Sequence, residues 1–240
     1  MRAIKSPCLQ VKEVKAIVLL TCLFSLMSSV NAAEEVKENI RQQGQWYGYW
    51  GWNRSPYSDS NISFKGEDHD FTLHKTSAKD RQNKVTVGSI FNRYLNPAAI
   101  TIPQYNYRVG YFVADNWAIS LGFDHMKYVV EQGQVVGMTG TISSPGFEKT
   151  DPAKEDKQIS GDFMNFEHTD GLNMISVETE YFHSLWNHGK DFDFALMAGA
   201  GIGFMYPKTN VKMLGYERND EFHVAGYATS VKGGFEFTFY

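Results

Sequence analysis

The sequence predicts an all-β protein: an antiparallel up-and-down transmembrane β-barrel, for which we expect eight strands. Apolar and polar side chains alternate with a two-residue period after about residue 100, which is the pattern of strands with two different faces. Aromatic residues make up 15% of the 240 residues, with 21 glycines and only 7 prolines, a composition typical of β-structure. After the N-terminus, no segment approaches the ~20 consecutive apolar residues that a spanning helix needs.

The first 32 residues have the pattern of a secretory signal peptide. Basic residues precede an apolar stretch from Ala16 to Met27, and small or permitted residues before Ala33 predict cleavage after Ala32. An uncleaved anchor is the alternative. Both cysteines, Cys8 and Cys22, lie in this segment, so the mature chain is expected to have no thiol chemistry. Residues 33–240 would then form one barrel domain.

The charge balance of the mature chain argues against a nucleic-acid partner. Residues 1–32 contain four of the 23 basic residues and one of the 27 acidic ones, so 19 basic and 26 acidic residues remain, a formal charge of −7. A nucleic-acid-binding protein would need a basic face instead.

The alternating runs are expected to pair as hairpins. Tight-turn residues at Ala114–Asn116 join two such runs, and Asn187–Gly189 join two more. The expected strands in this half of the chain are 105–113, 117–123, 175–181, 192–204 and 227–240. Before residue 100 we expect a first strand at Trp46–Trp52, a second within 60–78 and a third at 84–91.

The polar register of these strands predicts a barrel filled by charges. Each apolar face is long and free of charge, whereas the opposite face is small or charged, as lipid outside and a narrow polar lumen inside require. The expected lumen charge network consists of Arg108, Asp124, Glu178, Glu180, Lys232 and Glu236. Buried charges must be paired, so we expect them to plug the barrel. A small polar conduit, and a soluble barrel with an apolar interior, are the alternatives.

The connections alternate between short and long, as in outer-membrane barrels with periplasmic turns and external loops. The turns at 114–116 and 185–191 are short, whereas the connections at about 131–170 and 207–221 are long and polar. The carboxylates of the 131–170 connection lack the regular Asp-x-Asp-x-Asp spacing of a calcium loop. We therefore expect no metal site, and no motif indicates a cofactor.

The end of the sequence resembles the signal by which the outer-membrane assembly machinery recognises its clients. The residues that carry this likeness are Phe235, Phe237, Phe239 and Tyr240. From Trp46 to Tyr240 the pattern resembles the small eight-stranded outer-membrane barrel superfamily, typified by the transmembrane domain of outer membrane protein A and its W-type relatives. The resemblance implies location in a Gram-negative outer membrane, with outer-membrane lipid, lipopolysaccharide and the assembly machinery as partners. It carries over no functional residue.

One short motif points to catalysis. His168 and Asp170 precede a strand in a way that resembles the active strand of outer-membrane lipid A deacylases, but Asp170 stands where the nucleophilic serine should be. Ser176 would be a substitute from elsewhere. We therefore expect no catalytic residues and a non-enzymatic barrel with a structural or surface-interaction role. A lipid-modifying enzyme and a carrier or pore for a small molecule are the alternatives.

Overall fold

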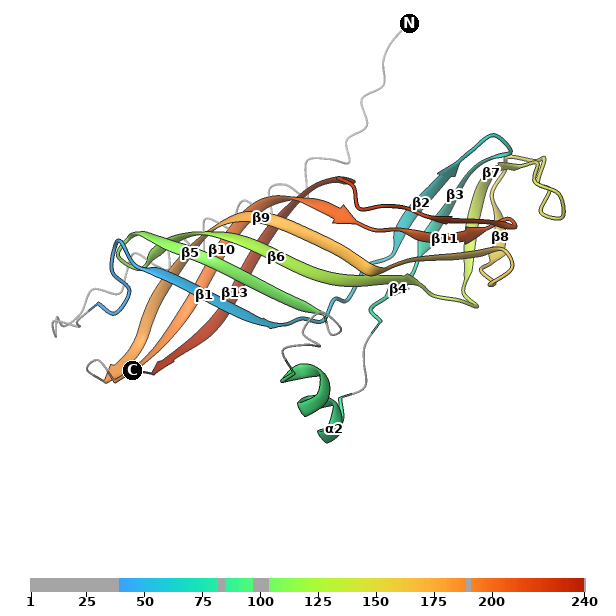
Figure 1. The fold of residues 1–240 in the computed structure, drawn as a ribbon. Helices are drawn as coiled ribbons and strands as arrows, with labels where there is room; N and C mark the ends of the chain where they lie inside the picture. Colours follow the sequence, from blue (N-terminus) through green and yellow to red (C-terminus); the bar gives the residue numbers. More distant parts are fainter. Residues whose placement is uncertain (1–38, 82–84, 97–103, 189–190, 240) are drawn as a thin grey trace, which may run out of the picture. The chain divides into compact units, whose positions relative to one another are not determined.

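A computed structural model describes residues 39–81, 85–96, 104–188 and 191–239. Over these ranges the protein is all-β, with two antiparallel sheets (Figure 1). The expected signal peptide, its cleavage site after Ala32, and Tyr240 lie outside the described residues. Within those ranges, no helix combines the length and apolar composition that crossing a membrane would require.

The larger sheet curls into a half-barrel, which we call the curled sheet. Its main strands, in the order in which they pair, are β1 (Trp46–Trp52), β5 (Tyr105–Ala114), β6 (Trp117–Val130), β9 (Met164–His188), β10 (Phe192–Pro207) and β13 (Gly226–Phe239). Every neighbouring pair is antiparallel, as alternation and short turns predict. Six main strands are paired in the described part of the chain, so the expected eight strands are not confirmed and no closed barrel is shown.

The strand pairing of both predicted hairpins is confirmed, but of the predicted second turn Asn187 and His188 belong to β9, and Gly189 lies outside the described residues. The turn at Asp115–Asn116 joins β5 to β6, with Asn116 in the left-handed region at φ 62°. β9 pairs with β10 along nearly the whole length of β10, with one register shift between Phe194 and Ala195. The predicted first strand, Trp46–Trp52, is also confirmed, and it pairs directly with β5.

The predicted second strand lies in a different sheet. Residues 60–78 form a hairpin of β2 (Ser60–Lys65) and β3 (His69–Thr76), which joins β7 (Val135–Ile142) and β8 (Glu155–Gln158) in a four-stranded sheet, here called the small sheet. Only β4 (Ala78–Lys79) pairs with the curled sheet, at the end of β6. The hairpin turns at Gly66, where the sequence interrupts the alternation.

The predicted third strand over 84–91 is wrong: Lys84 lies outside the described residues, and residues 85–91 contain no strand. Val87–Ser89 form a short helix, α2, and Ile90–Tyr94 continue it as a π-helix, η1. Thr86 starts the helix because its hydroxyl accepts the Ser89 amide at 3.1 Å, while the Ser89 hydroxyl accepts the Thr86 amide at 2.7 Å. This reciprocal capping box satisfies two otherwise free amides.

The small sheet packs against the far ends of β6 and β9 around an apolar core, here called the small-sheet core. Phe71 and Leu73 of β3, Met138 and Ile142 of β7, and Met164 of β9 are all buried there. Aromatic contacts link the sheets: Phe64 of β2 lies 5.7 Å from Phe166 of β9 between ring centroids. This core has the ordinary polarity of a water-soluble sandwich, with apolar side chains inside.

The two connections expected to be long loops contain further strands. The 131–170 connection includes β7, β8 and the first residues of β9, and the 207–221 connection contains a hairpin of β11 (Asn210–Met213) and β12 (Tyr216–Asn219). β11 also pairs with the start of β9. Hydrogen-bonded strands therefore replace much of the predicted loop.

Candidate functional site

The curvature of the larger sheet brings polar side chains from non-neighbouring strands together on its inner face. Tyr47 on β1 hydrogen-bonds Glu180 on β9, although β5 and β6 lie between these strands. Lys232 on β13 reaches Glu178 and Glu180 across β10. Such contacts are possible only across the concave side of a strongly curled sheet.

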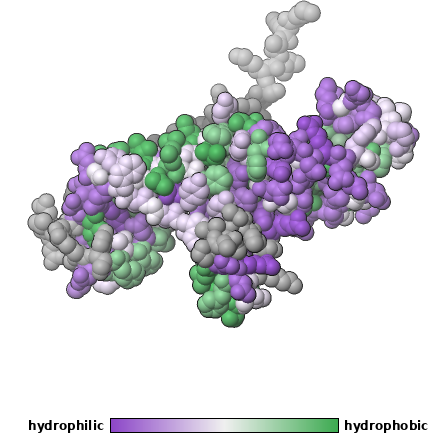
Figure 2. Space-filling view, viewed as in Figure 1, coloured by the Kyte–Doolittle hydropathy of each residue, from purple (hydrophilic) through white to green (hydrophobic). Residues whose placement is uncertain are grey.

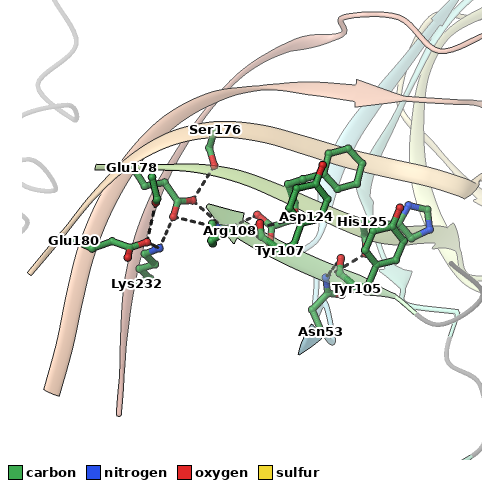
Figure 3. A network of polar contacts seen from close by, with 12 residues as sticks. Asn53, Tyr105, Tyr107, Arg108, Asp124, His125, Ser176, Glu178, Glu180 and Lys232 are labelled. Carbon is green, nitrogen blue, oxygen red and sulfur yellow. Dashed lines mark hydrogen bonds and ion pairs between the residues drawn. The ribbon is translucent and has the colours of Figure 1, made fainter. Parts of the chain in front are cut away.

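Arg108 lies at the centre of this inner-face network (Figure 3). Its Nε and Nη2 donate to the two carboxylate oxygens of Glu178 at 2.9 and 3.0 Å. Its Nη1 and Nη2 donate to Asp124 at 3.2 and 2.8 Å, and Nη1 also donates to the Tyr107 carbonyl at 3.0 Å. Two bidentate pairs use the planar geometry that distinguishes arginine from lysine.

Lys232 extends the network to a second carboxylate. Its ammonium group bridges Glu178 and Glu180, and Ser176 donates to Glu178 at 2.8 Å. Ser120 donates to Glu180 at 2.9 Å. Arg108, Glu178 and Glu180 are only 6%, 2% and 1% exposed, so pairing is what allows these charges to remain buried.

Five of the six predicted network residues are brought together here, and the sixth is not. Glu236 lies in a separate cluster, where Arg41 donates to it from Nε at 3.0 Å. Arg41 also pairs with Asp193, with 2.8 Å between Nη1 and Oδ2, and its guanidinium lies over the Phe182 ring. We define this as the Arg41 cluster; Thr238 accepts a longer hydrogen bond in it.

Sequence reasoning missed Arg41, because this residue precedes the first recognisable strand. Arg41 is only 5% exposed, and its carbonyl accepts the amide of Asn116 at 3.0 Å, which fixes it beside the β5–β6 turn. The unpaired acids on the polar register of β10 and β13, Asp193 and Glu236, were the available signal that a further cation was needed.

Glycines on the inner face make room for the network. A Cβ built on Gly122 would lie 2.5 Å from the Ser176 hydroxyl and 2.6 Å from Arg108 Nε. One on Gly201 would lie 2.6 Å from Glu178 Cγ. Side chains at these positions would displace the charged groups, so the glycines are part of the site's construction.

The outer face of the same strands is apolar and exposed. Figure 2 shows patches of hydrophobic residues on the surface of the curled sheet, among more polar ones. Tyr227 and Val231 on β13 are 94% and 81% exposed, and Leu121 on β6 is 64% exposed. The expected assembly-signal residues Phe235, Phe237 and Phe239 are exposed on this face as well.

His168 and Asp170, the candidate catalytic pair, do not meet a nucleophile in the described structure. His168 lies on β9 and its Nδ1 is 3.2 Å from the Thr209 hydroxyl, whereas Asp170 is 3.6 Å from Lys208 Nζ. Ser176, the substitute nucleophile, donates to Glu178 within the inner-face network. The three residues have separate partners and form no catalytic arrangement.

A polar contact also joins the small sheet to the β11–β12 hairpin. Tyr216 donates from its hydroxyl to Asp68 Oδ2 at 3.1 Å, and His69 Nδ1 lies 2.8 Å from Asp68 Oδ1. The hydrogen bond with His69 lowers the pKa of the Asp68 carboxyl below its usual value. Among the residues that the structure describes, no group of three or more His, Cys, Asp or Glu side chains is placed to hold a metal ion.

No protein-family model, curated protein or solved structure matches this chain. The polarity and geometry of the two faces of the curled sheet are therefore the features from which a function can be inferred.

Proposed function

We propose that this protein is an integral outer-membrane protein of a Gram-negative bacterium, in which the curled sheet forms the transmembrane wall and has a structural or surface-interaction role. The observation that carries the proposal is the inverted polarity of the curled sheet. Its charges are buried on the inner face and its large apolar side chains are exposed on the outer face. Both features are unfavourable in water. Exposed apolar patches of this extent normally mark a contact surface. In lipid both are favourable.

The length of the apolar face fits a bilayer. On β13 the exposed face runs from residue 227 to residue 239, about 40 Å along the strand at ~3.4 Å per residue. A strand tilted by about 40° would cover about 30 Å of the membrane normal, which is the thickness of the hydrocarbon layer.

The two edge strands are suited to complete a closed barrel. An open sheet edge is not tolerated in lipid, because its amides and carbonyls would lack partners. Tyr47 on β1 and Lys232 on β13 both contact Glu180, so side chains of both edge strands converge on one carboxylate. We propose that the wall closes between these edges, with the charge network filling the interior and opposing conduction.

The small sheet fits the external side of this barrel. The short β5–β6 turn is at the other end of the curled sheet, where outer-membrane barrels have their periplasmic turns. The small-sheet core and the β11–β12 hairpin would then extend into the extracellular medium, in contact with lipopolysaccharide. In this arrangement the exposed small sheet is the surface available for interactions.

Membrane fractionation together with gel mobility tests the proposal. The full chain, expressed in a Gram-negative host, should be recovered with outer membranes and should migrate faster on gels when unheated, because closed barrels resist detergent unfolding. A matched control is the same chain with Phe235, Phe237 and Phe239 replaced by serine, which should remain outside the membrane. Recovery of the unaltered protein as a soluble periplasmic species, with no heat-dependent mobility, would overturn the proposal.

A further inference from the structure

The connection between β4 and β5 contains a short helix, residues 86–95, here called the helical segment, with one apolar side and one polar side. Its large apolar residues follow the i, i+3, i+4, i+7, i+8 spacing that places side chains on one side of a helix, and they are Val87, Ile90, Phe91, Tyr94 and Leu95. The Leu95 amide donates to the Ile90 carbonyl at 2.8 Å, so the π-helical turn keeps these two residues on the same side. The residues on the other side are small or polar: Gly88, Ser89, Asn92 and Arg93.

The apolar side of the helical segment is exposed (Figure 2). Val87 is 74% exposed, Phe91 64% and Leu95 57%, and no residue of α2 or η1 is buried. A surface helix of a water-soluble protein normally turns its apolar side towards the core. Exposed apolar side chains gathered on one side of a helix therefore mark a contact surface.

Aromatic side chains connect this apolar side to the outer face of the curled sheet. The Tyr94 ring packs edge-on against Trp52 of β1, with 5.5 Å between the ring centroids and 76° between the planes. Trp52 in turn lies 4.7 Å from Trp50 between centroids, and both tryptophans are exposed. The apolar side of the helical segment is therefore continuous with the apolar outer face of the curled sheet.

The contact with Trp52 lies at the level where the outer face changes from apolar to polar. In the row of Trp50, the outward residues paired across β5, β6 and β9 are all aromatic or aliphatic. In the next row, which contains Trp52, the outward residues of β6 and β9 are His125 and Asn173. In a spanning barrel such a change marks the edge of the hydrocarbon layer, which is the depth that tryptophan and tyrosine prefer.

We propose that the helical segment lies in the head-group region of the outer leaflet, with its apolar side inserted among the upper parts of the acyl chains. The inference rests on the proposed function, which puts the outer face of the curled sheet in lipid. Amphipathic helices bind membrane surfaces in this orientation, parallel to the plane of the bilayer. Arg93, exposed on the polar side, would lie at the level of the lipid phosphates, and residues 85–96 include no acidic residue that an anionic surface would repel.

Lipid fits this surface better than a second copy of the chain does. Each partner in a stable protein interface contributes about 20–30 residues, far more than the apolar side of the helical segment offers. Lipid requires no such area here, because the membrane-spanning wall already holds the segment at the surface. Contact with a bilayer also covers the apolar side and the adjoining outer face with one medium.

Fluorescence quenching of single labelled cysteines in vesicles tests the inference. Replacing Cys8 and Cys22 by serine removes both cysteines of the full chain, so one introduced cysteine carries the only label. Phe91→Cys places an environment-sensitive fluorophore on the apolar side, and Asn92→Cys, the matched control, places it on the polar side of the same turn. Each chain is refolded into vesicles of phosphatidylethanolamine and phosphatidylglycerol that contain a phospholipid with a nitroxide either near the head group or near the end of the acyl chain.

The shallow nitroxide should quench the label at position 91 at least about twofold more than the label at position 92, because an interfacial helix buries only its apolar side, about 5–10 Å deep. At position 91 the shallow nitroxide should also quench more than the deep one. Equal quenching at the two positions, or stronger quenching by the deep nitroxide at position 91, overturns the inference. A label at position 91 that is shielded from water but quenched by neither nitroxide would mean that protein covers the apolar side, which also overturns it.

A third label separates this inference from the proposed function. Leu121→Cys, on the outer face of β6, should be quenched in any barrel that spans the bilayer. Absence of quenching there contradicts the proposed function and the inference with it, whereas quenching at position 121 without the difference between positions 91 and 92 overturns the inference alone. Heat-dependent gel mobility shows that each preparation has formed a barrel. Should Phe91→Cys fail to form one, Val87→Cys provides the label on the apolar side.

Discussion

The curled sheet and the small-sheet core both consist of strands in which apolar and polar side chains alternate. The curled sheet buries the polar face of these strands, whereas the small-sheet core buries the apolar face. On β9, Met164 is fully buried among apolar side chains, whereas further along the same strand Val177 is exposed and Glu178 is buried. β6 changes in the same way between Leu121 and Val130. One chain therefore contains one region suited to water and one suited to lipid. Alternation specifies that a strand has two faces, and the surrounding medium decides which face is buried.

Removing the central cation of the curled sheet should have the largest effect on stability. Arg108→Ala leaves Glu178 and Asp124 without their bidentate partner, and breaking a buried pair typically costs about 3–5 kcal/mol. The urea midpoint for unfolding in detergent micelles should fall accordingly, without an appreciable rise in ion conductance in planar bilayers.

The control for Arg108→Ala is charge reversal in the small sheet, Asp156→Lys. Asp156 is exposed, and exposed ion pairs contribute only about 0–1 kcal/mol, so its midpoint should barely change. Equal midpoints for Arg108→Ala and wild type would mean that water reaches the inner face. A large rise in conductance would instead favour a gated conduit over a filled interior.

Placing a charge on the exposed face of the curled sheet, and in a second variant on the exposed face of the small sheet, tests directly whether the two faces contact different media. Leu121 on β6 and Val135 on β7 are both 64% exposed, so in water an arginine at either position would be tolerated equally. In a bilayer, Leu121→Arg should cost about 2–4 kcal/mol, whereas Val135→Arg should stay within about 0.5 kcal/mol. Unfolding midpoints of the two variants in lipid vesicles provide the measurement. Similar small changes at both positions would contradict a lipid-facing curled sheet.

A smaller loss of stability is expected from adding a methyl group to a glycine that lies between the charges of the inner face. A methyl group on Gly201 would lie 2.6 Å from Glu178 Cγ and 3.0 Å from the Val177 carbonyl oxygen. Overpacking of this kind typically costs about 1–3 kcal/mol, so Gly201→Ala should lower the unfolding midpoint. Gly233 on the neighbouring β13 provides the matched site, because its nearest contact would be 3.8 Å away and Gly233→Ala should be neutral. Loss of stability in both variants would show that strand flexibility, not inner packing, determines the response.

The smallest expected effect is a local decrease in amide-exchange protection at low pH, in the β11–β12 hairpin of the water-exposed region. The pKa of Asp68 is lowered in the folded protein, so its contribution is present at neutral pH and is lost as the pH falls below about 4, where the carboxyl takes up a proton. Amide-exchange protection of the β11–β12 hairpin, relative to unfolded peptide at the same pH, should then decrease. Asp68→Asn should show the lower protection already at pH 6 and little further change. Equal protection of the wild-type hairpin at pH 3 and pH 6 would show that the hydrogen bond between Tyr216 and Asp68 does not stabilise the hairpin.

The strands after residue 100 could be predicted because their two faces differ sharply in chemistry. Five network residues follow from the same argument, since a charge opposite an apolar face has to be inside. The β2–β3 hairpin shows the limit: Phe71 and Leu73 alternate with polar residues just as the spanning strands do, yet they belong to the small-sheet core. The two-residue period of a strand does not by itself show whether its exposed face contacts lipid or water.

Two further errors have local causes. The segment from Val87 to Tyr94 has strand-like composition, but the capping box between Thr86 and Ser89, a four-residue signal, starts a helix. Arg41 was missed because its partners, Asp193 and Glu236, are far along the chain and no periodic pattern connects them. Contacts of that range become visible only in the folded sheet.

The Arg41 cluster joins parts of the chain that are synthesised at opposite times. Arg41 and Glu236 are separated by 195 positions, and Tyr47 and Glu180 by 133. The pair of Arg41 and Glu236 can form only after nearly the whole chain has been made, and contacts of such long range are slow to form. Until Glu236 has been made, Arg41 lacks one of its two carboxylate partners. The Arg41 cluster is therefore complete only when β13, the last strand of the curled sheet, is in place.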